Sequence, residues 1–76
     1  MQKLKIRFQK ADDVFQFVKA LRQFDFDIDL SSGHQVVDAK SIVSAVALSG
    51  ASDLMLTIHN DDCGSVIESI SPYITA

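Results

Sequence analysis

Three short segments of the chain alternate apolar with polar residues, and this pattern limits the chain to folds that contain a one-sided sheet. The segments are residues 2–8, 25–30 and 53–59. Strict alternation predicts a β-strand that buries one face and leaves the other in water. The polar positions of the first two segments are charged: Lys3, Lys5, Arg7, Asp25, Asp27 and Asp29. We interpret them as a solvated charged face of the sheet rather than as a ligand site.

Other segments change to helical periodicity. Residues 12–24 place apolar side chains on one face, which predicts an amphipathic helix. Ser41 is a suitable N-cap for a short apolar helix over residues 42–48. A last helix is expected to begin at residues 60–62 and to end or kink at Pro72. A fourth strand, at residues 35–39, follows a turn of serine and glycine.

The expected order of elements is βαββαβα. Four strands that each have one apolar face need a layer of helices on one side only, which predicts an α+β, two-layer open-faced β-sandwich. The 76 residues are enough for a single domain, 1–76. About 60% of the unfolded surface is buried in a domain of this size, so its stability is expected to be modest.

Composition excludes several classes of partner. A net charge of −3 gives no reason to expect nucleic acid or an anionic membrane as partner. No apolar run approaches the roughly 20 residues that span a bilayer. Cys63 is the single cysteine and cannot form an internal disulfide, which favours a reducing, cytoplasmic compartment. No cofactor motif is present, and none is expected to bind.

Three short motifs, in the right order and spacing, resemble HPr, the histidine phosphocarrier family of the bacterial sugar phosphotransferase system. Residues 39–42 (Ala-Lys-Ser-Ile) resemble the regulatory serine motif at the start of the family's short second helix. Residues 17–19 are similar to a first-helix motif, and residues 56–58 fall where the fourth strand is expected. The resemblance covers about residues 4–70. It implies an antiparallel sheet in the order first, fourth, second, third, with the helices on one face.

The chain departs from this family at the site that defines it. The family carries Gly, an aliphatic residue, His, Ala or Ser, Arg and Pro just before the first helix, whereas residues 8–13 here read FQKADD. With the first helices aligned, Lys10 stands at the histidine position and Asp12 at the arginine position. With the first strands aligned, about five residues of this loop are missing. In either alignment the histidine is absent, so no residue takes over the catalytic role.

The chemistry of these residues agrees with that conclusion. A phosphohistidine at a helix N-terminus depends on free backbone N–H groups and nearby cations. Asp12 and Asp13 place negative charge in that turn and would repel a phosphoryl group. Lys10 is protonated at neutral pH and is therefore a poor nucleophile.

Ser41 is the strongest candidate for a functional residue. Its simplest role is that of a helix N-cap, and the resemblance implies that it is also a phosphorylation site. Phosphate there would make the surface beside Lys40 dianionic. Ile42 and Val43 cannot both face the core fully, so one is a candidate anchor for a partner. The expected partner-binding residues are Lys40, Ser41, Ile42, Val43 and Val46, with Lys10 and Phe15 as an extension.

The two histidines are weaker candidates. His34 lies beside a turn glycine and His59 ends a strand. No closed zinc pattern matches the spacing of His59, Cys63 and Asp61 or Asp62, so no metal site is expected. Cys63 near a helix start is expected to be a plain small residue.

The resemblance implies a regulatory protein-interaction module rather than an enzyme. HPr paralogues that keep the serine and lack the histidine are phosphorylated by a serine kinase and then bind a transcription regulator in carbon catabolite regulation. One alternative is an active phosphocarrier that uses His34 or His59 as an atypical site. Another is a small structural or ligand-binding α/β domain. The chain is expected to be a monomer or a weak dimer.

Overall fold

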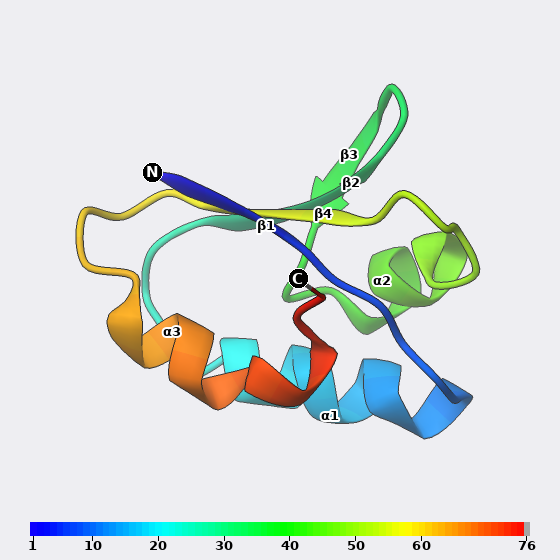
Figure 1. Ribbon diagram of the computed structural model, residues 1–76, viewed down its shortest axis with the longest axis horizontal. Helices are drawn as coiled ribbons and strands as arrows, with labels where there is room; N and C mark the ends of the chain where they lie inside the picture. Colours follow the sequence, from blue (N-terminus) through cyan, green and yellow to red (C-terminus); the bar gives the residue numbers. More distant parts are fainter. Residues whose placement is uncertain (76) are drawn as a thin grey trace.

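A four-stranded antiparallel sheet forms one layer of the molecule and the helices form the other (Figure 1). The computed structural model describes residues 1–75. The elements are β1 (Gln2–Lys5), α1 (Ala11–Leu21), β2 (Ile28–Ser32), β3 (Gln35–Asp38), α2 (Ile42–Leu48), β4 (Met55–Ile58), α3 (Gly64–Ser69) and the 3₁₀ helix η1 (Ser71–Tyr73).

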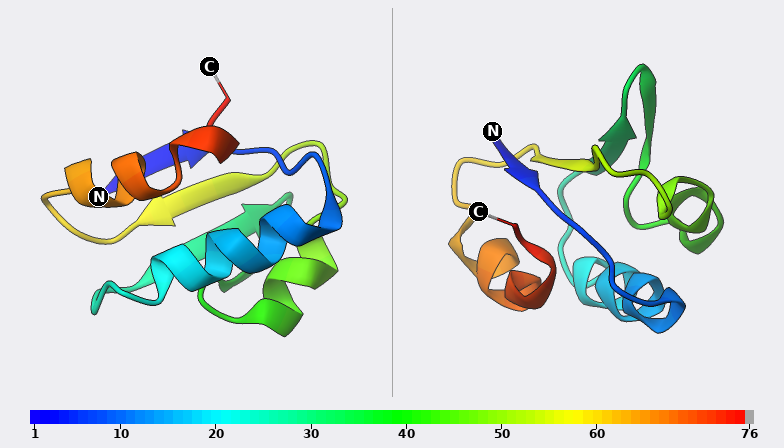
Figure 2. Two further views of the ribbon diagram at one scale, coloured as in Figure 1. Left: turned by 90° about the horizontal axis from the view of Figure 1, so that it is seen from below. Right: turned by 45° about the vertical axis from the view of Figure 1, so that its right-hand side comes forward.

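The strands lie side by side in the order β1-β4-β2-β3, and every neighbouring pair is antiparallel. Figure 2 shows all three helices on the same face of this sheet. The α+β two-layer fold and its strand order are therefore confirmed.

The free edge of β1 is partly paired by the C-terminal segment. Arg7 donates its backbone N–H to the Tyr73 carbonyl at 2.8 Å, and Thr75 donates to the Lys5 carbonyl at 2.9 Å. Ile6 and Ile74 form an antiparallel bridge. The opposite edge, β3, has a neighbour on one side only.

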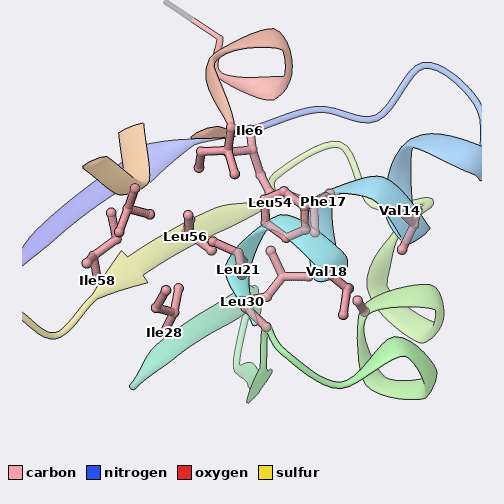
Figure 3. Packing of buried hydrophobic residues seen from close by; sticks show 14 of the residues in the cluster. Ile6, Val14, Phe17, Val18, Leu21, Ile28, Leu30, Leu54, Leu56 and Ile58 are labelled. Carbon is pink, nitrogen blue, oxygen red and sulfur yellow. The ribbon is translucent and has the colours of Figure 1, made fainter. Parts of the chain in front are cut away.

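The core lies between the sheet and the helices. Alternation directs Leu30, Leu56 and Ile58 toward the helices, and each side chain is fully buried. Figure 3 shows them facing one side of α1, which contributes Phe17 and Leu21. A helix with apolar residues at this spacing buries one stripe and leaves the rest in water.

Two boundaries differ from the sequence prediction near the end of α1. The helix ends at Leu21 rather than at residue 24, and β2 begins at Ile28 rather than at residue 25. The rings of Phe24 and Phe26 pack against each other with centroids 5.6 Å apart, and both are partly buried against the core. Residues 22–27 therefore form an anchored loop, although the alternation through Phe26 imitates a strand.

The start of the last helix also differs from the prediction. α3 begins at Gly64, not at residues 60–62. Asn60 donates its side-chain amide to the Asp62 carbonyl at 2.9 Å, and the Asp62 carboxylate accepts from the Gly64 N–H at 3.2 Å. Short polar side chains that bond nearby backbone in this way favour turns over helix. Pro72 lies in η1, after α3 has ended.

None of the helices within residues 1–75 combines the length and apolar composition needed to cross a bilayer.

Candidate protein-interaction site

The first turn of α1 is closed by one of its own carboxylates. Lys10 is the N-cap, with extended backbone (φ −148°, ψ 163°). The Asp13 carboxylate accepts hydrogen bonds from the Gln9 N–H at 3.0 Å and from the Lys10 N–H at 3.2 Å. A carboxylate that reaches back from the third helical residue is half of a capping box. It occupies the amide of the N-cap and the amide of the residue before it.

The surroundings of this turn are aromatic and acidic. Phe17 packs edge-on against Phe8 and Tyr73, with ring centroids 5.0 Å and 5.8 Å away. Burial first, and then the negative charges of Asp13 and Asp12, raise the pKa of the Tyr73 phenol above its usual value of 10.0. The two carboxylates thus add negative charge beside the first turn of α1.

Neither histidine lies at this turn. Ile58, the residue before His59, pairs with Gln2 at the start of β1. The first turn of α1 comes after the other end of β1, so His59 and this turn lie at opposite ends of that strand. The His59 Nε2 lies 2.8 Å from the Asp29 carboxylate on the open face of the sheet. His34 is in the two-residue turn between β2 and β3, where Gly33 has a φ of +60°. This hairpin projects away from the helices (Figure 1).

Residues 1–75 hold no cluster of three or more side chains that could ligate a metal. Cys63 is buried, and its Sγ donates to the Asn60 carbonyl at 3.2 Å. Asp61 and Asp62 are exposed, as is His59.

Ser41 is the N-cap of α2, as the sequence predicts. Its Oγ is half-buried and accepts a hydrogen bond from the Ser44 N–H at 3.4 Å. The preceding residue, Lys40, donates its ammonium group to the Phe24 carbonyl. Lys40 therefore ties down the loop after α1.

Arg22 is a second cation near Ser41 that the sequence analysis missed. Its Nε donates to the Lys40 carbonyl at 3.0 Å, although the two residues are 18 positions apart. No local pattern in the sequence indicates this contact, because it depends on how α1 and α2 pack.

The exposed apolar side chains of α1 and α2 are two valines of α2 and one phenylalanine of α1. Val43 is 81% exposed, Val46 46% and Phe15 45%. Ile42 is partly buried against the core, so of this adjacent pair it is Val43 that faces solvent. We name these three exposed residues, together with Ser41, the α1–α2 surface.

Helical geometry places Phe15 on the side of α1 that faces α2. Arg22 is seven residues further on and therefore lies on nearly the same side of the helix, and it reaches Lys40. Val43 and Ala47 line a shallow groove between α2 and β3. Val46 does not line this groove.

Lys10 lies apart from the serine. A shallow pocket at the start of α1 is lined by Lys10, Val14 and Ser49, the C-cap of α2. Because Arg22 at the end of α1 meets the start of α2, the two helices run antiparallel. Lys10 and Ser41 are therefore near opposite ends of α2, with the exposed valines between them.

A scan against protein-family models and a search of curated proteins both found no match.

Proposed function

We propose that this chain is an HPr-like regulatory module that binds a protein partner through the α1–α2 surface. Its proposed setting is carbon catabolite regulation in the bacterial cytoplasm, with phosphorylation of Ser41 by a serine kinase as the switch and a transcription regulator as the partner. The observation that carries the proposal is the position of Val43, 81% exposed and two residues after Ser41.

The acidic first turn of α1 supports a binding role over phosphoryl transfer. A phosphocarrier needs an imidazole with free amides and cations around it. Here the Asp13 carboxylate accepts the Gln9 and Lys10 amides, and residues 8–13 contain no histidine. We therefore propose no catalytic residue.

The energetic case for the α1–α2 surface rests on exposed apolar area. Each large apolar side chain that a partner covers contributes about 1.5–3 kcal/mol when fully buried. Val43, Val46 and Phe15 are the exposed large apolar side chains of α1 and α2. Three such contacts suit a partner with a hydrophobic recognition surface.

Phosphorylation would change the charge of this surface without disturbing the core. The Ser41 side chain is only half-buried, and its single hydrogen bond, to Ser44, is long. A phosphate there would carry about −1.5 to −2 charges and three acceptor oxygens close to Arg22 and Lys40. The partner would then recognise apolar and anionic groups side by side.

The test compares the chain carrying phosphoserine at position 41 with the unmodified chain. Each is immobilised, exposed to host lysate, and every captured protein is then titrated in purified form against both. We expect a regulator that binds the phosphorylated chain at least ten-fold more tightly, and Val43→Asp should abolish that binding. Gln16→Asp, which places the same charge on an exposed part of α1 outside the surface, should have no effect. Equal affinity for both forms would overturn the serine switch, and insensitivity to Val43→Asp would overturn the surface.

A further inference from the structure

The open face of the sheet separates its charges by strand. On this face β1 presents Lys3 and Lys5, whereas β2 and β3 present Asp29 and Asp38. The register sets Lys3, Thr57, Asp29 and Asp38 in one row across the four strands. The face therefore has a basic edge and an acidic edge.

The middle of this face is uncharged. β4 lies between the two edges and contributes Met55 and Thr57, both partly buried. Within residues 1–75 the one side-chain ion pair within 4.0 Å joins His59 to Asp29. Among residues 1–75, consequently, no carboxylate lies within 4.0 Å of the Lys3 or Lys5 ammonium group.

Asp29 and Asp38 are directly opposite each other in the β2–β3 register. Like charges at opposed positions destabilise an antiparallel pair. A cation placed over this pair from outside the chain would offset that repulsion.

We propose that this open face is a self-association surface, on which a second copy of the chain packs with its basic β1 over the acidic β2 and β3. A two-fold axis parallel to the strands exchanges the two edges, so each copy places Lys3 opposite the other's row of Asp29 and Asp38, and Lys5 lies in the neighbouring row. Both contacts are attractive, and Met55 of each copy lies near the axis. Such a contact is isologous and closes as a dimer.

The β2–β3 hairpin adds to this geometry. Figure 1 shows the hairpin rising from the sheet on the side opposite the helices, next to β4. A second copy that packs on the open face would lie against the base of this hairpin, where Asp29 and Asp38 are paired. The helical layer, with the α1–α2 surface, stays free on the outside of the dimer.

The size of the face predicts a weak dimer. Four strands of this length make a face about 19 Å wide and about 13 Å long. The area of such a face is well below the roughly 800 Å² that each partner buries in a standard interface. Association should therefore depend on concentration and, because it rests on exposed charges, on salt.

The test uses sedimentation equilibrium on the full chain and two charge-reversed variants. One variant carries Lys3→Glu and Lys5→Glu, and the other carries Asp29→Lys and Asp38→Lys. Reversal at Asp29 and Asp38 removes the His59 pair and the hydrogen bond that Asp38 accepts from the Lys40 N–H at 2.9 Å, so thermal unfolding should show some loss of stability. Each variant alone should lose at least about ten-fold in dimer affinity.

An equimolar mixture of the two variants should recover the dimer, because every edge then again meets an edge of opposite charge. The parent dimer should weaken between about 0.01 M and about 1 M salt, as the Debye length falls from roughly 30 Å to roughly 3 Å. A parent chain that stays monomeric at low salt would overturn the proposal. A dimer that persists in the Lys3→Glu, Lys5→Glu variant would also overturn the proposal. Both lysines are exposed, so this outcome does not depend on whether the second variant folds.

Discussion

The Asp13 carboxylate accepts the backbone N–H of Lys10 at 3.2 Å, across the first turn of α1. The same oxygen also accepts from the Gln9 N–H at 3.0 Å. The start of this helix is thus closed by an anion from the helix itself. Such a carboxylate stabilises the helix N-terminus and also excludes a competing phosphoryl group.

Removal of this carboxylate should weaken the fold. We expect Asp13→Ala to lower the free energy of unfolding by about 1 kcal/mol, from the lost cap and the lost charge–dipole attraction. Asp12→Ala is the matched control, since Asp12 is exposed and lies in the same turn. Urea unfolding of both variants measures the difference, and equal losses would show that the Asp13 hydrogen bonds contribute nothing.

Two phenylalanines on α1 should separate stability from binding. Phe17 is fully buried, and Phe17→Ala should cost about 3–5 kcal/mol. A domain of this length has about 4–11 kcal/mol in total, so that variant should lose a large share of its stability and melt well below the parent chain. Phe15 is 45% exposed, and Phe15→Ala should change stability by less than about 0.5 kcal/mol while weakening partner binding. Circular dichroism melts of the two variants make the comparison, and similar melts would contradict the assigned faces of α1.

The ammonium group of Lys40 should hold the loop that follows α1. Lys40→Met keeps most of the aliphatic stem but leaves the Phe24 carbonyl without its donor. We expect a loss of about 1 kcal/mol. Lys19→Met, on the exposed side of α1, should be close to neutral. Hydrogen exchange of residues 22–27 should also accelerate in the Lys40 variant alone, and unchanged protection there would argue against this tie.

Stability should fall in alkali because of Tyr73. Its pKa is raised in the folded state, so the folded protein holds this proton more tightly than the unfolded chain does. The stabilisation is complete below the unfolded value of about 10 and is lost as the pH rises through the folded value. Tyr73 is the single tyrosine of the chain, so tyrosinate absorbance reports it directly. Tyr73→Phe should remove this alkaline slope, and a native titration at or below pH 10 would contradict the burial.

The Asp53 carboxyl should titrate below its usual range. A hydrogen bond from the Ser32 hydroxyl at 2.5 Å is the main cause of its lowered pKa, and the Gly33 N–H adds to it at 3.1 Å. The associated stability is present above the unfolded pKa of about 3.8 and is lost as the pH falls through the lower folded value. Carboxyl chemical shifts followed by NMR should show this, and Ser32→Ala should return the pKa toward normal.

Local periodicity predicted the elements well because it depends on which side of each segment is buried. The faces of α1 and β4 follow directly from the spacing of Phe17, Leu21 and Leu56. The resemblance to HPr supplied the strand order, which alternation alone does not contain. The sequence could not distinguish the anchored loop at Phe26 from a strand, because a loop that packs on a core carries the same apolar spacing.

The candidate site was predicted less completely than the fold. Ser41 as an N-cap follows from its position before an apolar helix, and the structure bears it out. The separation of Lys10 from Ser41, and the contact of Arg22 with Lys40, depend on the antiparallel packing of two helices. Contacts of this kind arise between distant segments, and no local pattern encodes them.

The most direct test is incubation of the chain with the general phosphotransferase enzyme and labelled phosphoenolpyruvate, beside an active HPr as positive control. The HPr control should acquire acid-labile phosphate. This chain should acquire none, because the start of its α1 is acidic and self-capped. Label on this chain that is acid-labile, and that disappears in His34→Ala or His59→Ala, would contradict the account at its centre.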